Sequence, residues 1–546
     1  MGAISTVLAM LMAVVISALL VRISPLNAPR PLVQIGLGAV IAMISRKPVA
    51  LDPEVFFLLF LPPLLFLDGW RIPNEQLLRH RGPILGLALG LVVCNVVGMG
   101  YLIHWMIPPI PLPAAFALAA VISPTDPVAV SGITARVPLP EHIRRRLEGE
   151  SLLNDASGLV CFRFAIAAAL TGTFSLGRAS VTFLWLVIGG VLAGAGLTYG
   201  VMRLKNAISR WQGEESGPQV LISLLIPFVA YEAANAIGSS GILAAVAAGV
   251  TMSYTELWGG SLGTTRMQRA AVWDTVQFAL NGVMFVLLGE QLPGILSGAA
   301  QMVSQSNHTG PWWLAVYVVA INFVLAALRF AWVALSLRLH EFVAVLRGRP
   351  APDRTDPRMI VAMSLGGVRG AVTLAGVLTV PLTLADGRSF PERELIIFLA
   401  AGVILVSLLA ASIALPRLLR SMELTPEPTH EAELDRAGVA AAEAAIRAME
   451  ALRQQPASGQ EDEANVRAET STRIIELYRR RIEGRLPQSE KAFRIRRAEQ
   501  IERQMRLTAL RAEREAVFAQ ARAHLISDAT SRLLVREIDL LEERFK

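Results

Sequence analysis

A short polar segment, GESLLNDASGLVCFRFA at residues 149–165, interrupts an apolar stretch and carries the residues best suited to chemistry. On a helix, Glu150 and Asn154 lie on one face because residues four apart are neighbours. Ser151 and Asp155 form a second pair beside the first. A charged side chain at the centre of a membrane-spanning helix costs roughly 2.5–3.5 kcal/mol. Two carboxylates, a hydroxyl and an amide within one turn therefore predict an ion site, and a purely structural polar cluster between helices is the alternative.

The composition is that of a membrane protein. Of 546 residues, 53% are hydrophobic and the mean hydropathy is +0.50, above the roughly 45–50% apolar share of soluble domains. The net charge of +7 belongs to residues 1–420, which hold 29 basic and 21 acidic residues, against 22 and 23 in residues 421–546. Basic residues collect in cytoplasmic loops, and no basic stripe with interleaved aromatics predicts nucleic-acid binding. Cys94 and Cys161 have neither disulfide nor metal-ligand spacing, so no cofactor is expected.

Apolar runs near the roughly 20 residues needed for one crossing predict the membrane spans. Thirteen are expected: 4–23, 31–45, 54–70, 83–107, 111–135, 149–171, 181–202, 218–237, 241–254, 272–293, 312–337, 359–381 and 394–416. Nineteen basic residues lie at the ends of odd-numbered spans or in the connections after them, and five lie in connections after even-numbered ones. This bias places the N-terminus outside and the C-terminus in the cytoplasm.

Two of these spans contain helix-breaking residues at mid-depth. Span five carries SPTDP at residues 123–127, and each proline removes a helical N–H and obstructs the preceding turn. Span twelve carries GGVRG at residues 366–370. The two spans are seven apart and so run in opposite directions, as in an inverted repeat, where paired broken helices mark a transporter's binding site. The alternative is that Pro and Gly are common in spanning helices generally.

The sequence therefore predicts an all-α membrane protein of about thirteen transmembrane helices in an inverted repeat with two broken crossing helices. Residues 1–420 form the transmembrane domain, and residues 421–546 form a charged helical cytoplasmic tail. The tail alternates dense Arg and Glu with scattered apolar residues. Regulation, dimerisation and a plain solvated extension all fit this pattern.

Six motifs occur together in the order found in one transporter family. They are LPPLLFLDGW (61–70), ISPTDPVAV (122–130), GESLLNDASGLV (149–160), GSSGILAAVAAG (238–249), FALNGVMFVLLGEQL (278–292) and SLGGVRGAVTLA (364–375). With them, the chain resembles the bacterial sodium/proton antiporters of the monovalent cation:proton antiporter group, which includes the animal sodium/proton exchangers. The resemblance implies a thirteen-helix homodimer in the bacterial plasma (inner) membrane that exchanges one monovalent cation for protons, for pH and sodium homeostasis.

The resemblance also implies roles for the residues of the predicted ion site. Asp155 matches the family's essential carboxylate, which holds cation and proton in turn. Asp126 and Thr125 match the unwound part of the crossing helix. Ser151 matches a hydroxyl that contacts the cation, and Asn154 an amide that steadies the site.

Other charged residues in the spans have less direct matches. Asp68 falls where relatives place an acidic residue near the ion, or else lies at a span end by the interface. Glu150 and Arg369 match a buried ion pair joining the two halves. The resemblance assigns no role to Arg163.

The chemistry of the site predicts how such a protein works. A carboxylate removed from water is protonated more readily than in solvent, and it holds either a proton or a small hard cation with oxygen ligands. Competition for one carboxylate with alternating exposure is antiport. Asn154 beside Asp155 leaves one obligatory carboxylate in the pair, and relatives with Asn here are generally electroneutral. Na⁺, Li⁺ and K⁺ are all candidate substrates.

Two other functional classes are alternatives. A sodium-coupled organic-solute symporter on a similar inverted-repeat scaffold would also need broken helices. An intramembrane enzyme would need a nucleophile with a base, or a metal cluster, and the sequence shows no such constellation. No phosphate-binding GxxxxGK[ST] loop is present, so ATP is not the expected energy source.

Overall fold

The computed structural model describes the chain in thirteen stretches. These are residues 3–23, 29–45, 53–71, 81–134, 141–171, 176–257, 262–305, 312–346, 356–384, 388–422, 428–454, 461–485 and 490–545. Within them the regular structure is helical, apart from an isolated β-bridge between Thr383 and Ser389. The chain divides into two compact units, residues 1–423 and residues 424–546.

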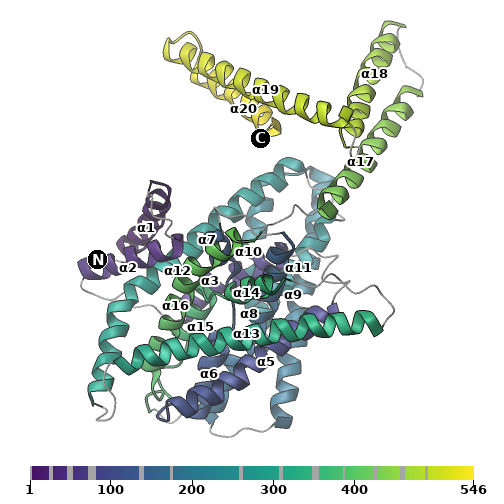
Figure 1. The fold of residues 1–546 in the computed structure, drawn as a ribbon. Coiled ribbons are helices and arrows are strands. Elements are labelled where there is room, and N and C mark those ends of the chain that lie inside the picture. The colour runs from purple at the N-terminus through teal and green to yellow at the C-terminus, as the bar shows by residue number, and fades with distance from the viewer. Residues whose placement is uncertain are drawn as a thin grey trace. The chain divides into compact units, whose positions relative to one another are not determined.

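The first unit is a bundle of helices, traced in Figure 1. Its helices are α1 (Ala3–Ile23), α2 (Arg30–Ser45), α3 (Pro53–Arg71), α5 (Arg81–Met106), α6 (Leu112–Ile122), α7 (Pro127–Thr134), α8 (Glu141–Thr171), α9 (Leu176–Gln212), α10 (Ser216–Ala236), α11 (Gly241–Leu257), α12 (Gly263–Gln305), α13 (Trp312–Leu346), α14 (Pro357–Leu365), α15 (Ala371–Leu378) and α16 (Arg393–Arg420). Each predicted span falls on one of these helices or on a pair of short ones.

Several described helices are suited to crossing a membrane. Six of them, α1, α9, α10, α12, α13 and α16, are long and apolar enough by length and composition. Four shorter apolar segments lie in α2, α5, α6 and α8. Many of the loop residues that predict the orientation of the chain lie outside the described stretches, so the orientation and the count of thirteen spans stay predictions.

The two predicted interruptions lie outside helices. Helix α6 ends at Ile122, residues 123–126 are non-helical, and α7 begins at Pro127. Proline suits this first helical position because its missing N–H would have no helical partner there. Helix α14 ends at Leu365, and α15 begins at Ala371 after the glycine-rich residues 366–370.

The two interruptions contact each other directly. The backbone N–H of Asp126 donates to the carbonyl of Val368 over 2.7 Å. Backbone groups released from helices inside a membrane need partners within the protein, because lipid supplies none. This hydrogen bond satisfies one group from each interruption and fixes the two crossing points against each other.

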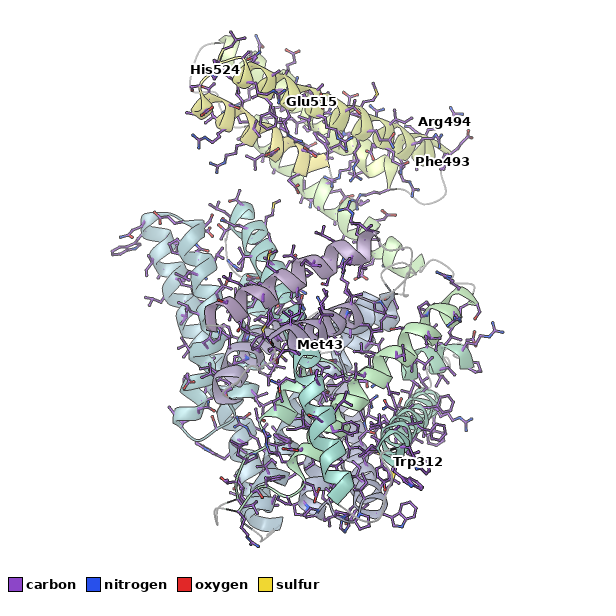
Figure 2. The ribbon with its side chains drawn as sticks, turned by 90° about the vertical axis from the view of Figure 1, so that its left-hand side faces the viewer. Met43, Trp312, Phe493, Arg494, Glu515 and His524 are labelled. Atoms are coloured by element: carbon purple, nitrogen blue, oxygen red, sulfur yellow. The ribbon has the colours of Figure 1, made fainter. Side chains whose placement is uncertain are left out.

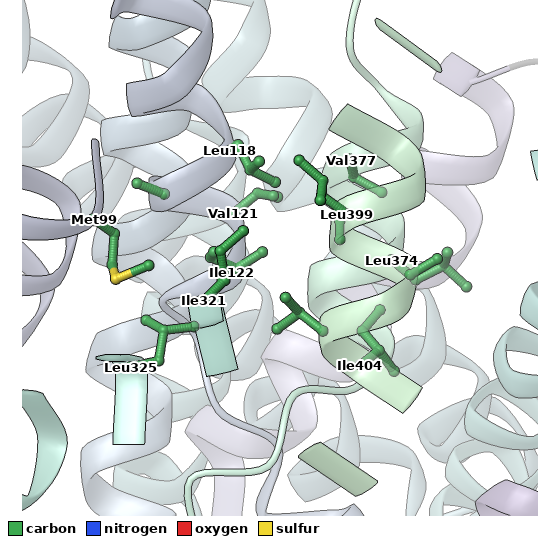
Figure 3. Packing of buried hydrophobic residues seen from close by; sticks show 14 of the residues in the cluster. Met99, Leu118, Val121, Ile122, Ile321, Leu325, Leu374, Val377, Leu399 and Ile404 are labelled. Carbon is green, nitrogen blue, oxygen red and sulfur yellow. The ribbon is translucent and has the colours of Figure 1, made fainter. Parts of the chain in front are cut away.

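The half-helices around the interruptions are embedded in the largest apolar cluster of the bundle. In Figure 3, α6 side chains such as Leu118 and Val121 lie opposite the α15 side chains Leu374 and Val377. Leu399 of α16 lies between the labelled groups. The buried face of α6 is also rich in alanine, and small residues allow helices to approach closely where packing drives association. The interruptions are therefore held in a tightly packed frame.

The surfaces of the two units differ in chemistry. The bundle exposes apolar side chains such as Met43 and Trp312 (Figure 2), as expected of a lipid-facing surface. The second unit consists of α17 (Pro428–Gln454), α18 (Glu461–Gly484), α19 (Glu490–Arg522) and α20 (Asp528–Phe545). Its surface carries charged side chains such as Arg494 and Glu515, as expected of a water-exposed helical tail.

The last two tail helices are joined by a partly buried ion-pair group. Arg514 of α19 pairs with Asp539 over 2.9 Å and also with Glu542, both on α20. Glu542 is buried. A guanidinium that serves two carboxylates fixes the register of the hairpin more firmly than exposed pairs do.

Candidate ion-binding site

A small cavity lies where the two interruptions meet α3, α8 and α12. Its volume is about 20 Å³, which exceeds the roughly 10–15 Å³ needed to hold one water molecule. The cavity is lined by Leu64, Asp68, Pro124, Thr125, Asp126, Asp155, Gln277, Asn281, Gly370, Val372 and Thr373. Four of the predicted site residues, Asp68, Thr125, Asp126 and Asp155, are therefore brought together from three separate elements.

Three carboxylates share this cavity, and Asp155 is the most deeply placed. Its side chain is 3% exposed, and Oδ1 has no hydrogen-bond partner among the described residues. Asp126 is partly buried, and its Oδ1 accepts the backbone N–H of Ala129 over 3.1 Å at the start of α7. An unpaired buried carboxylate oxygen is costly. Asp155 is thus the group that a proton or a cation stabilises most.

Two predicted site residues lie behind the cavity and support its wall. The Ser151 hydroxyl donates to the Thr125 carbonyl over 2.5 Å, which ties α8 to the interruption after α6. The Asn154 amide donates to Glu150 Oε1 over 3.2 Å, and Asn154 is fully buried. Neither Ser151 nor Asn154 is among the residues that line the cavity. In this structure they position the neighbours of Asp155.

Gly370 lets the second interruption approach the acidic site. A Cβ atom built on Gly370 would lie 1.8 Å from Oδ2 of Asp126. No side chain fits there without displacing the carboxylate. The glycine-rich sequence that interrupts the helix therefore also makes room for Asp126.

The predicted ion pair between Glu150 and Arg369 is wrong, because Glu150 pairs with a different arginine. Arg329 of α13 places Nη1 at 2.7 Å from Glu150 Oε1 and donates from Nη2 to Oε2 over 3.1 Å. It also donates from Nε to the carbonyl of Met363 at 3.1 Å. The bidentate contact between Arg329 and Glu150 joins α13 to α8, and the bond to the Met363 carbonyl joins α13 to the end of α14.

Arg369 instead serves the backbone of the interrupted helices. Its guanidinium donates to the carbonyls of Ile122 at 3.1 Å and Gly367 at 2.5 Å. Ile122 ends α6, where carbonyls lack helical partners and the helix dipole is negative. These two carbonyls accept from Nε and Nη1 of Arg369, while its buried Nη2 has no hydrogen-bond partner among the described residues.

Three further residues line the cavity that the sequence did not single out. Gln277 and Asn281 stand four apart on α12, and Thr373 lies on α15. The amide oxygen of Gln277 accepts a hydrogen bond from Arg71 over 2.6 Å. The spacing of Gln277 and Asn281 is the signal that would have placed both on one helical face. Arg163 does not line the cavity, and its role stays open.

Comparisons with known proteins identify the family. The family model described as sodium/hydrogen exchanger, transmembrane, matches residues 10–421. The chain is 41% identical over 542 residues, 98% of each chain, to the uncharacterized Na(+)/H(+) exchanger YjcE of Escherichia coli (strain K12). It is 44% identical over 415 residues to the sodium, potassium, lithium and rubidium/H(+) antiporter of Bacillus subtilis (strain 168), covering 75% of this chain and 60% of that one.

A solved structure shares the fold. The sodium proton antiporter MjNhaP1 from Methanocaldococcus jannaschii matches with a TM-score of 0.54 and 17% identity, over 76% of this chain and 98% of that chain. The all-helical fold and the resemblance drawn from the six motifs are confirmed by these matches. The chain belongs to the sodium/hydrogen exchanger family, whose members are membrane transporters and not enzymes.

Proposed function

We propose that this protein exchanges a monovalent cation for a proton at Asp155. The observation that carries the proposal is the unpaired, buried Oδ1 of Asp155 in a cavity shared with Asp68 and Asp126. A carboxylate in such a place is stabilised either by a proton or by a cation. Because the cavity has room for about one water-sized species, the two occupants exclude each other.

Exchange requires that the occupied site opens to one side of the membrane at a time. A cation entering from one side displaces the proton from Asp155, and a proton entering from the other side displaces the cation. The gradient of one ion then drives the other, and each pH unit supplies about 1.4 kcal/mol per proton. The two interrupted helices bring helix ends and non-helical backbone to the site, an arrangement typical of alternating-access transporters.

The lining and supporting residues have distinct proposed roles. Thr125, Asp126 and Asp68 supply oxygen atoms to the cation, either directly or through water. Ser151 and Asn154 hold the Asp155 segment of α8 in register through the contacts described above. Since Ser151 does not line the cavity, its hydroxyl oxygen joins the cation only after the site rearranges.

The relatives indicate the class of substrate. The antiporters of Bacillus subtilis and Bacillus pumilus are named for sodium, potassium, lithium and rubidium. We propose Na⁺, Li⁺ and K⁺ as candidate substrates of this chain. The alternative of a sodium-coupled organic-solute symporter finds no support in the family match or the named relatives.

The proposed assembly follows the family resemblance. The transmembrane domain, residues 1–420, has thirteen spans in an inverted repeat and forms a homodimer in the bacterial inner membrane. The N-terminus lies outside, and the tail of residues 421–546 lies in the cytoplasm. The opposed interruptions that meet through Asp126 and Val368 support the inverted repeat.

Fluorescence dequenching in everted membrane vesicles tests the exchange. Vesicles are acidified by respiration in a host lacking its own antiporters, and NaCl, LiCl, KCl or choline chloride is added at several pH values. Alkalinisation by at least one alkali cation, absent with choline and in vesicles without the protein, is expected. A well-expressed protein that gives no response to any alkali cation contradicts the proposal.

A further inference from the structure

Thr373 presents a buried hydroxyl that the contacts described so far do not use. It is the third residue of α15, its side chain is 1% exposed, and it lines the cavity beside Asp155. Its Oγ1 finds no hydrogen-bond partner among the described residues. Thr373 and Asp155 therefore line the same small cavity, and each holds a buried oxygen atom without a partner, Oγ1 and Oδ1.

A helical threonine normally satisfies its hydroxyl within its own helix. Thr134 donates to the carbonyl of Val130, and Thr251 donates to that of Ala247. Such bonds to the preceding turn are the ordinary outcome for buried Ser and Thr. Thr373 lies too near the start of α15 to have a full helical turn before it, and it makes no such bond.

We infer that Thr373 Oγ1 is a direct ligand of the transported cation, so that the second interrupted helix contributes to selectivity. The inference rests on the proposed exchange function. Small hard cations bind to carboxylate, hydroxyl and carbonyl oxygens that replace their water shell. The hydroxyl is the kind of ligand such a cation needs, and a bound cation satisfies an oxygen that the protein leaves unpaired. Asp155 supplies the charge and Thr373 supplies a neutral oxygen.

Na⁺-dependent thermal stabilisation of the purified protein measures cation binding apart from transport. A ligand that binds the folded state raises the free energy of unfolding by RT ln(1 + [L]/Kd), and the unfolding temperature rises with it. Thr373→Val keeps the shape and removes the oxygen, whereas Thr373→Ser keeps the oxygen. Thr198→Val is the matched control, because Thr198 is also fully buried with an unpartnered hydroxyl but lies on α9, outside the cavity lining.

The valine variant should need about tenfold more Na⁺ for the same stabilisation, equivalent to about 1.4 kcal/mol. The apparent KM for Na⁺ in vesicle exchange should rise by a similar factor. The loss should be larger for Li⁺ than for K⁺, because the more strongly hydrated ion depends more on each replacing oxygen. Thr373→Ser and Thr198→Val should behave like the parent protein in both measurements.

The inference is overturned if Thr373→Val depends on the cation concentration as the parent protein does. It is also overturned if Thr198→Val loses as much cation affinity as Thr373→Val. The unfolding temperature without added cation shows whether each variant is folded, and Thr373→Ala replaces the valine variant if it is not. Absence of exchange by the parent protein would count against the proposed function instead.

Discussion

At the scale of single residues, the site depends on how closely uncharged groups approach its carboxylates. Gly370 leaves no room for a side chain beside Asp126, and Asp126 in turn holds the first turn of α7 through Ala129. Asp126 therefore has two separable functions, as a charge in the cavity and as a helix cap. Substitutions that remove one function and keep the other show which of the two is needed for transport.

Asp126→Asn should cripple exchange while leaving the protein folded. Asparagine caps helices about as well as aspartate, so the bond to Ala129 survives and only the negative charge is lost. Asp126→Ala removes both functions, and a lost cap costs about 1 kcal/mol. We therefore expect both variants to be inactive in vesicles and only the alanine variant to unfold at lower temperature. Parent-like cation affinity and rate in Asp126→Asn would remove Asp126 from the site.

Gly370→Ala should abolish exchange despite adding only a methyl group. The added Cβ would lie 1.8 Å from the Asp126 carboxylate, so the carboxylate or the backbone must move. Gly196→Ala on α9 is the control, because nothing beyond the adjacent backbone of its own helix lies within 4 Å of its Cβ position and alanine favours a helix by roughly 1 kcal/mol over glycine. The measurement is the exchange rate at matched protein levels. Full activity of Gly370→Ala would show that the close approach is dispensable.

At the scale of helices, charged side chains connect elements that are distant in sequence. Glu150 and Arg329 join α8 to α13, while Arg369 ties its own segment to the end of α6. Side chains that link helices in this way hold those helices against one another.

A double-mutant cycle distinguishes the two arginines. Glu150→Gln or Arg329→Gln alone should lower thermal stability strongly, because breaking a buried pair typically costs about 3–5 kcal/mol. The loss should be larger for Glu150→Gln, which leaves the 2% exposed Arg329 side chain uncompensated, than for Arg329→Gln, which leaves a Glu150 side chain that is 22% exposed. The double variant should recover part of the loss. The same cycle with Glu150 and Arg369, which form no direct ion pair, should show weaker coupling. Strong coupling of Glu150 to Arg369, with none to Arg329, would contradict the observed pairing.

The sequence predicted the elements of this site better than it predicted their partners. Prolines and glycines dictate local backbone geometry, so the interruptions at 123–126 and 366–370 were visible in the sequence. The four-residue spacing on α8 likewise paired Asn154 with Glu150, and the two are hydrogen-bonded. The choice between Arg329 and Arg369 was not visible, because the packing of α13 against α8 decides it. Thr373, Gln277 and Asn281 were missed for the same reason, since they face the cavity only through tertiary packing.

At the scale of the whole molecule, the number of protons exchanged decides whether membrane voltage drives transport. Asp155 has an amide neighbour in Asn154, whereas Asp68 and Asp126 line the same cavity. We expect one cation to exchange for one proton, because Asp155 is the one of the three carboxylates lining the cavity that combines deep burial with an unpartnered oxygen. Net charge then does not move across the membrane.

Proteoliposomes with a potential clamped by potassium and valinomycin check this stoichiometry. A sodium gradient is imposed, and the rate of internal pH change should be the same at every clamped voltage. The steady-state sodium ratio should equal the proton ratio. A rate that changes steeply with voltage, or a sodium ratio above the proton ratio, would show that a second carboxylate releases its proton.

The most direct measurement of competition at Asp155 is proton release when Na⁺ is added to the purified protein in weakly buffered solution. Binding of a cation to a protonated ligand group releases its proton, so the parent protein should release up to about one proton per chain, saturating with Na⁺ and diminishing where Asp155 is already ionised. Asp155→Asn, folded by its unfolding temperature, should release none. No release from the parent protein at any pH, or equal release from Asp155→Asn, contradicts exchange at this carboxylate.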